Sequence, residues 1–342
     1  MKPLEQYKKF PPSRYMGSKN KIIINLHNIF AKLKFNSALD LFSGSSSVSY
    51  LLKSMNKKVF SNDYMHFSAN ISKAIIENNN VTLNKKDIIS LTKTPKNYDK
   101  FVQKKFKNVF FSDNDNNFID IVRHNVKNIK NIYKKSIALA SLAKACQKKQ
   151  PRGIFTYISD GKSDGRKDLK KSFKEQFLDA INIFNNSVFD NKKNNKSINL
   201  DFMDVQQKAD LVYIDPPYFS KYSDNEYVRR YHFVEGIVRD WQGVKIQESS
   251  KVKKFKKYPS MFDSEKNSFD AIDYLIKKYS NSKIVLSYSS NSLPTLKEIK
   301  DIVKKNKKEL IVKKINYTYS FGTQKKGKDI KNLVKEYIIL IK

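Results

Sequence analysis

The chain has 342 residues, a length that suits one large domain or two smaller ones. Apolar residues make up 39% and aromatic residues 13%, which is enough for a sizeable core and excludes a disordered chain. Lys and Arg total 67 against 33 Asp and Glu, and the net charge of +34 favours nucleic acid as a partner, although an AT-rich genome also enriches lysine. The sequence lacks a membrane-spanning window and a secretory signal, and the single Cys146 excludes an internal disulfide, so we expect a cytoplasmic protein that does not contact membranes.

The N-terminal part follows an α/β pattern. Apolar residues at helical spacing predict a helix over 20–33, and a short apolar run predicts a strand over 38–42. A serine-rich turn at 43–47 leads into a predicted helix over 48–55 and a second strand over 58–61. Strand, turn, helix and strand together form the repeating unit of a mainly parallel sheet.

The middle of the chain differs from its flanks. Residues 80–195 are dense in Lys and Asn, and they contain a long predicted helix over 118–147, with Cys146 on its buried face, and a polar loop at 159–167. Strand patterns return at 197–200, 211–214 and 283–287, and residues 310–342 predict two strands joined by a basic loop at 322–328. We therefore expect one α/β core, formed by residues 1–75 and 196–342, with a largely helical insertion at 76–195.

The strongest candidate for chemistry is the run Asp215-Pro216-Pro217-Tyr218, which directly follows the predicted strand 211–214. The prolines fix φ and lack N–H groups, so the loop is stiff and its carbonyl oxygens stay available. Asp215 and the Pro216 carbonyl can each accept a hydrogen bond from an exocyclic amine, and Tyr218 offers a flat face on which an extruded base can stack. The alternative is a rigid turn that carries a surface tyrosine.

A second candidate site closes the first predicted strand. Asp40, Phe42 and Gly44 lie at the strand end and in its turn, and Asp63 ends the second strand. A glycine turn followed about 20 residues later by an acid is the arrangement that holds an adenosine ribose. One glycine rather than three argues against a pyrophosphate and favours a nucleoside cofactor.

A third motif, Arg14-Tyr15-Met16-Gly17-Ser18-Lys19, precedes the first helix. In this order the three motifs resemble those of the DNA adenine methylase family, S-adenosylmethionine-dependent enzymes that methylate adenine N6, in their alpha arrangement. Ser18 lies where many members of that family have a second glycine. Shorter runs resemble the members from restriction–modification systems: 145–147 with 151–153, Tyr222 with 230–233, and 286–291.

The resemblance implies a class I methyltransferase fold, with a Rossmann-like, mostly parallel seven-stranded sheet and an inserted target-recognition region. It implies that the flipped adenine binds at Asp215, Pro216, Pro217 and Tyr218. The residues implied to hold the cofactor, S-adenosylmethionine, are Tyr15, Lys19, Asp40, Phe42, Gly44, Asp63, Asp201, Phe202 and Asp215, with Asp204 the alternative to Asp201. Arg229, Arg230 and His232 follow the catalytic loop and are candidates for DNA contact.

The expected function is therefore site-specific methylation of adenine N6 in duplex DNA, without a metal, by a monomer. The resemblance also admits a cognate restriction endonuclease as a partner. Two alternatives stay open among enzymes: methylation of adenine N6 in RNA, and methylation of cytosine N4 in DNA. A third is a non-catalytic nucleic-acid-binding protein on the same fold.

Overall fold

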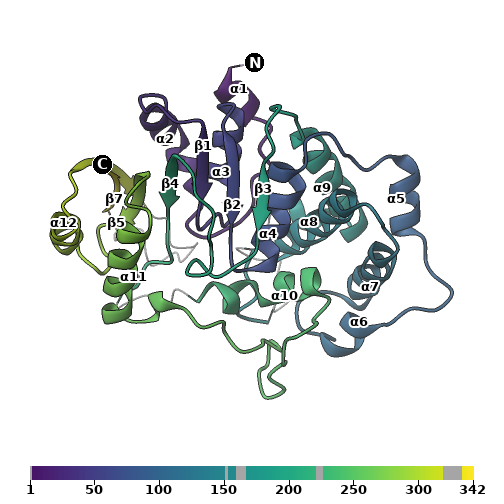
Figure 1. The fold of residues 1–342 in the computed structure, drawn as a ribbon. Helices are drawn as coiled ribbons and strands as arrows, with labels where there is room; N and C mark the ends of the chain where they lie inside the picture. The colour runs from purple at the N-terminus through teal and green to yellow at the C-terminus, as the bar shows by residue number, and fades with distance from the viewer. Residues whose placement is uncertain (1, 151–152, 159–166, 221–225, 319–332) are drawn as a thin grey trace.

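The computed structural model describes residues 2–150, 153–158, 167–220, 226–318 and 333–342. Its centre is a seven-stranded sheet with the order β3-β2-β1-β4-β5-β7-β6, in which β7 runs opposite to the other six strands (Figure 1). The strands are β1 Ser37–Asp40, β2 Lys58–Asn62, β3 Lys196–Ile198, β4 Leu211–Ile214, β5 Lys283–Ser289, β6 Leu310–Thr318 and β7 Leu333–Ile341. The expected class I methyltransferase fold, with its mostly parallel sheet, is confirmed.

The central strands are buried on both faces, which is why they read as short apolar runs rather than as alternating ones. In β4, Leu211 and Tyr213 belong to the hydrophobic cluster on one face of the sheet, whereas Val212 and Ile214 belong to the cluster on the other face. This alternation follows from the two-residue period of a strand. The sheet is therefore the middle of three layers.

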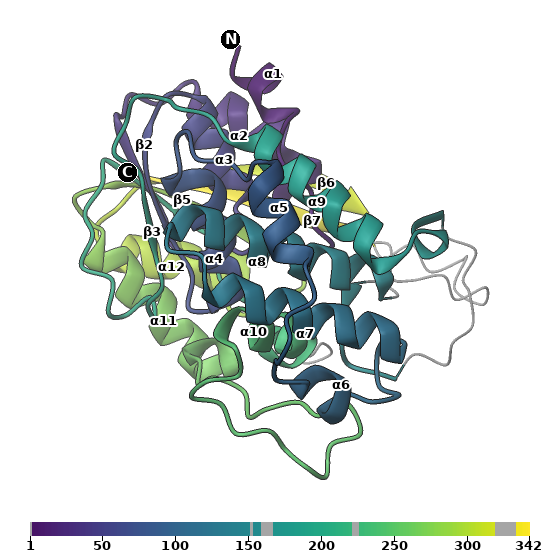
Figure 2. The ribbon, with the colours of Figure 1, turned by 90° about the vertical axis from the view of Figure 1, so that its right-hand side faces the viewer.

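Helices form the two outer layers, and Figure 2 shows them from the side of α5, α7 and α8. α11 (Glu265–Lys278) and α12 (Leu296–Lys305) pack on one face, and their apolar residues belong to a single cluster with β1, β4 and β5. The remaining α-helices are α1 Pro3–Tyr7, α2 Ile23–Phe30, α3 Ser47–Ser54, α4 His66–Ser72, α5 Lys85–Thr92, α6 Phe101–Lys105, α7 Asp113–Lys127, α8 Ile132–Lys149, α9 Phe173–Ser187 and α10 Tyr227–Arg239. The shorter helical turns are η1 Lys19–Ile22, η2 Lys73–Glu77, η4 Lys167–Lys170 and η5 Met261–Asp263.

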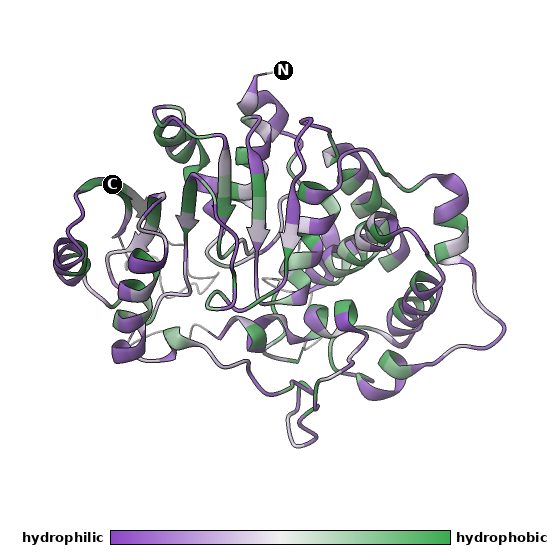
Figure 3. Ribbon diagram, in the orientation of Figure 1, coloured by the Kyte–Doolittle hydropathy of each residue, from purple (hydrophilic) through white to green (hydrophobic). Residues whose placement is uncertain are grey.

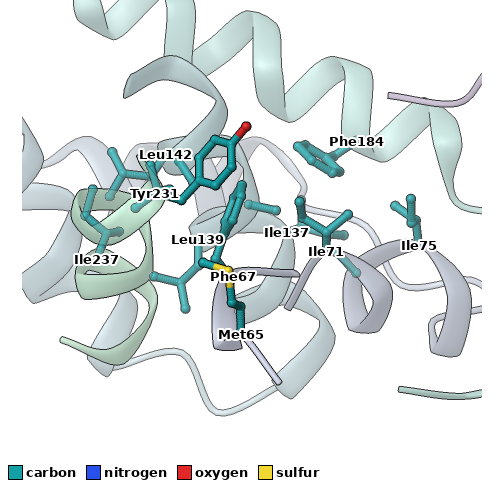
Figure 4. Close-up of a cluster of buried hydrophobic side chains, with 14 of the residues drawn as sticks. Met65, Phe67, Ile71, Ile75, Ile137, Leu139, Leu142, Phe184, Tyr231 and Ile237 are labelled. Carbon is teal, nitrogen blue, oxygen red and sulfur yellow. The ribbon is translucent and has the colours of Figure 1, made fainter. Parts of the chain in front are cut away.

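α8 and α9 share a core with helices from the flanking parts of the chain. Figure 4 shows Phe67 near Ile137 of α8, Phe184 of α9 and Tyr231 of α10. Burying such side chains stabilises the fold by about 1.5–3 kcal/mol each. The inner helices of the segment 76–195 are therefore packed against the same core as α4 and α10.

The single long helix expected over 118–147 is wrong. The structure has two helices, α7 ending at Lys127 and α8 beginning at Ile132. The side chain of Asn131 accepts hydrogen bonds from the N–H groups of Tyr133 and Lys134, which is the favoured way to begin a new helix. Cys146 lies on the buried face of α8, as expected.

Hydropathy follows this layering. In Figure 3 green covers parts of the central strands and the inner sides of many helices, whereas the outer sides of the helices are mainly purple. Across the described part of the chain, none of the helices combines the length and the apolar character needed to cross a bilayer. Residues 151–152, Tyr222 and the basic loop 322–328, together with most of the polar loop 159–167, lie outside the described residues.

Candidate active site at the carboxyl edge of the sheet

The candidate residues meet at one edge of the sheet. Asp40 ends β1, Asp63 follows β2, and Asp215 follows β4, and these strands are parallel, so their carboxyl ends lie side by side. β7 runs the other way, so its first residues reach the same edge, where Glu336 pairs with Ser289 at the end of β5. This edge lies at the lower side of the sheet in Figure 1, above α10. Both candidate motifs thus belong to one site.

The centre of the site is a contact network around Asp215. Its Oδ1 accepts a hydrogen bond from the hydroxyl of Tyr218 at 2.6 Å and lies 2.7 Å from Nζ of Lys19. The Lys19 ammonium also lies 5.2 Å from the centre of the Tyr218 ring. One cation therefore contacts both the carboxylate and the aromatic ring of the Asp-Pro-Pro-Tyr run.

Glu336 is the fourth member of this network. Its Oε1 lies 3.4 Å from Nζ of Lys19 and 3.2 Å from the hydroxyl of Tyr218. The side chains of Glu336 and Lys19 are only 3% and 6% exposed, and that of Asp215 is 15% exposed. Burial raises the pKa of Glu336 above its usual range, although the charge of Lys19 works against this effect.

Asp63 holds the turn after β1 in place. Its Oδ2 accepts the N–H of Gly44 at 2.8 Å, and its Oδ1 accepts the N–H of Met65 at 2.9 Å. Gly44 has a φ of +50°, and a Cβ there would lie 2.8 Å from Cε1 of Tyr15, so the position requires glycine. Burial raises the pKa of Asp63 to about 7.

Asp40 carries a polar atom without a partner. Its Oδ2 accepts the hydroxyl of Ser49 at 2.6 Å, whereas its Oδ1 is buried and has no hydrogen-bond partner among the described residues. Burial raises the pKa of Asp40 to about 7. A buried carboxylate oxygen of this kind is costly unless a ligand donates to it.

Tyr15 is held by two tyrosines of α10. Its ring stacks on Tyr231 with centroids 4.9 Å apart and an interplanar angle of 4°, and on Tyr227 at 5.7 Å and 25°. Tyr227 and Tyr231 are one helical turn apart, so they present their rings on the same side of α10. The hydroxyl of Tyr231 accepts the N–H of Met16 at 2.7 Å, which fixes the loop that leads to Lys19.

An aromatic cluster lies beside the turn that follows β1. Phe42 packs on Phe202 with ring centroids 5.4 Å apart and on Phe262 at 5.7 Å. Asp201 is half-buried and accepts the N–H of Met203, whereas Asp204 is exposed. The position of Asp201 is therefore the more enclosed of the two alternatives.

The three DNA-contact candidates on α10 have different surroundings. Arg229 is exposed and Arg230 is half-buried, and Arg229 lies 4.0 Å from Glu226. His232 is completely buried, and its Nε2 lies 2.9 Å from the carbonyl oxygen of Phe155. Burial lowers the pKa of His232 to about 4, so the ring is neutral. His232 is therefore a core residue, and its side chain is not available for the DNA contact expected from its place after the catalytic loop.

The sequence alone did not reveal two buried acids. One is Glu336. The other is Glu235 of α10, whose carboxylate accepts the N–H groups of His66 and Phe67 at the start of α4 and the hydroxyl of Tyr258. Within the described ranges, no group of three or more His, Cys, Asp and Glu side chains is arranged to hold a metal ion.

The chain is also similar in sequence to known proteins. The sequence model of the D12 class N6 adenine-specific DNA methyltransferases matches residues 15–319. The chain is 25% identical to the Type II methyltransferase M2.HphI of Haemophilus parahaemolyticus, over 97% of this chain and 98% of the relative. It is 26% identical to the modification methylase StsI of Streptococcus sanguinis and to the Type II methyltransferase M.FokI of Planomicrobium okeanokoites, over 94% and 85% of this chain but only 51% and 46% of those relatives. The chain belongs to the D12 class of N6 adenine-specific DNA methyltransferases.

Proposed function

We propose that this chain methylates N6 of one adenine within a defined sequence of duplex DNA, with the adenine flipped into the site at Asp215-Pro216-Pro217-Tyr218. The observation that carries this proposal is the placement of the Asp215 carboxylate and the Tyr218 ring together at the carboxyl edge of the sheet. In such sheets, ligands bind at this edge. A carboxylate beside an aromatic face fits a base that carries an exocyclic amine.

The turns after β1 and β2 fit S-adenosylmethionine. Asp40 offers a buried acceptor oxygen that has no partner among the described residues, and Gly44 lets the turn pass close to the ring of Tyr15. The residues that would hold the cofactor are Tyr15, Lys19, Asp40, Phe42, Gly44, Asp63, Asp201, Phe202 and Asp215, with Asp63 toward the ribose hydroxyls and Asp40 toward the methionine part. When bound, S-adenosylmethionine supplies a methyl group on a sulfonium leaving group.

The chain itself contributes positioning. The N6 lone pair is delocalised into the adenine ring, so it is a poor nucleophile until its N–H groups are held out of the ring plane. Asp215 and the carbonyl oxygen of Pro216 would accept these N–H groups, and Tyr218 would hold the base by stacking. Holding the adenine and the methyl donor in a fixed orientation supplies most of the rate acceleration in a transfer that forms no covalent enzyme intermediate.

Charge supports duplex DNA as the substrate. The net charge of +34 supplies the attraction to phosphates, and Arg229 on α10 is exposed near the site. We propose that residues 1–75 and 196–342 form the catalytic domain and that the segment 76–195 provides the target-recognition surface. The inner faces of α8 and α9 pack in the shared core, so base contacts in this segment fall to its outer parts.

We further propose that the protein acts as a monomer in a prokaryotic cytoplasm, as the modification enzyme of a restriction–modification system. The relatives named above are type II methyltransferases and a modification methylase, which supports this role and a cognate endonuclease as partner. Methylation of RNA or of cytosine N4 is the alternative. Competition between duplex DNA and structured RNA as methyl acceptors separates the first of these. On duplex DNA, log Kd against log salt should have a slope of about 0.9 for each phosphate contact.

Sequencing that detects modified bases in DNA tests the proposal directly. Genomic DNA from cells that express the chain should carry N6-methyladenine at one recurring sequence, and DNA from cells that express Asp215→Ala should not. Methyl groups on cytosine, or on RNA in preference to duplex DNA, would contradict the proposal. The same experiment identifies the recognition sequence.

A further inference from the structure

The ammonium of Lys19 contacts the two groups that would bind an incoming adenine, the Asp215 carboxylate and the Tyr218 ring. It lies 2.7 Å from Oδ1 of Asp215, and it lies over the ring of Tyr218 at 5.2 Å. If the N6 amine of the base donates to Asp215 and the base stacks on Tyr218, the ammonium lies in the position that the base must take. Base entry therefore requires the ammonium to leave this position.

The buried surroundings limit where the ammonium can go. Lys19 is 6% exposed, and moving an unpaired charge through such surroundings costs several kcal/mol. Within the described part of the chain, Glu336 offers a second carboxylate in reach, because its Oε1 lies 3.4 Å from the same Nζ atom. Glu336 is 3% exposed and lies in a strand, so its backbone is fixed on both sides by β5 and β6.

The donors and acceptors of the network also favour Glu336 as the group that receives the ammonium. Lys19 has three N–H donors, and its acceptors among the described residues include the Gly17 carbonyl at 3.1 Å, Asp215 and Glu336. Oδ1 of Asp215 is contacted by both Lys19 and Tyr218, so the two lone pairs of this oxygen are used. Release of Lys19 from Asp215 frees one lone pair, and a shorter contact to Glu336 replaces the one that is lost.

We propose that Glu336 is a positioning residue that receives the Lys19 ammonium when the target adenine displaces it from Asp215 and from the Tyr218 ring. The free protein thus keeps its base site closed with its own cation, and the base exchanges places with that cation. This inference rests on the proposed function, since it needs an adenine at Asp215.

The test measures base entry without methyl transfer. Duplex DNA keeps adenine at the target position that sequencing identifies and carries 2-aminopurine at the neighbouring base. The rise in fluorescence of this neighbour, when the adenine leaves the stack, reports the flipping equilibrium in the absence of cofactor. Glu336→Gln keeps the shape of the side chain but removes the receiving charge. We expect the flipping equilibrium constant to fall about tenfold or more, the factor that a hydrogen bond to a charged group contributes.

A double-mutant cycle separates this role from a structural one. In the Lys19→Met background there is no cation to receive, so adding Glu336→Gln should change flipping less than about twofold. Glu309→Gln, the same substitution at an exposed position before β6, is the matched control and should leave flipping unchanged. Glu336→Asp retains the charge and should flip better than Glu336→Gln, which keeps the test valid if the Gln variant folds poorly.

The outcomes are distinguishable. An equal loss in both Lys19 backgrounds, no loss from Glu336→Gln, or a Glu336→Asp variant no better than Glu336→Gln would each overturn the exchange. Methylation of adenine by the wild-type protein in the sequencing experiment would still support the proposed function in those cases. Absence of adenine methylation would instead overturn the proposed function itself.

Discussion

The two halves of the site are built in different ways. On the cofactor side, Asp63 and Asp40 bind groups from the same strand–helix–strand unit, at most 19 residues away: Asp63 accepts the N–H groups of Gly44 and Met65, and Asp40 accepts the hydroxyl of Ser49. On the base side, side chains from distant parts of the chain contact one another, as Lys19 does with Asp215 and Glu336. The first half is fixed by backbone turns, whereas the second consists of side chains that can exchange partners.

The largest expected effect comes from a substitution that acts mainly on the base side. Asp215→Ala removes the acceptor for the N6 amine, so methyl transfer should fall by about a hundredfold or more. The turns that hold Asp40 and Asp63 do not depend on Asp215, so the fold should survive. Single-turnover transfer and calorimetry with S-adenosylmethionine, measured on the same preparation, check this separation.

Some loss of cofactor affinity is compatible with the account, because Asp215 is also expected to lie near the methionine part. A variant whose affinity for S-adenosylmethionine falls severely, while its transfer rate at saturating cofactor stays at the wild-type level, would contradict the assignment of Asp215 to the base.

The difference between local turns and contacts among distant side chains also explains which parts of the site could be predicted from the sequence. The turn with Gly44 and Asp63, and the Asp-Pro-Pro-Tyr run, are local patterns that directly follow predicted strands, and the structure places them at strand ends. Glu336 reaches the site only because β7 is antiparallel and in one register with β5. That register is a property of the assembled sheet, so no short run of sequence around Glu336 could have shown it.

The errors within helices have a related cause. Residues 231–237 of α10 are all buried, so the helix has no polar stripe that would have marked His232 as a core residue. The break between α7 and α8 depends on the cap formed by Asn131, which the apolar periodicity on either side of it hides. Tertiary surroundings decided both cases.

A second prediction concerns a substitution on the cofactor side. Asp63→Ala leaves the ribose hydroxyls and two backbone N–H groups without an acceptor, so binding of S-adenosylmethionine should weaken by about 1–3 kcal/mol. Asp63→Asn, which keeps one acceptor oxygen, is the matched control and should lose less. Calorimetry on folded protein measures both, and an unchanged affinity in Asp63→Ala would remove this residue from the cofactor site.

A smaller effect concerns pH. Burial raises the pKa of Asp40 to about 7, so in the free protein this carboxyl is protonated below that pH and ionised above it. A cationic ligand binds the ionised form, so affinity for S-adenosylmethionine should fall as the pH drops below about 7, by at most about tenfold per pH unit. Asp40→Asn should bind more weakly and show a flatter pH profile. An equally steep profile in Asp40→Asn would assign the proton to another group.

Tyr218 provides the most direct test of the central claim, that the Asp-Pro-Pro-Tyr loop holds the flipped adenine. The measurement is single-turnover methyl transfer to duplex DNA at saturating cofactor, with Tyr218→Phe and Tyr218→Ala compared with the wild-type protein. Tyr218→Phe keeps the ring and should retain much of the rate, whereas Tyr218→Ala loses about 1–3 kcal/mol of base stacking and should be severely impaired. A Tyr218→Ala variant that methylates as fast as the wild-type protein would contradict the account.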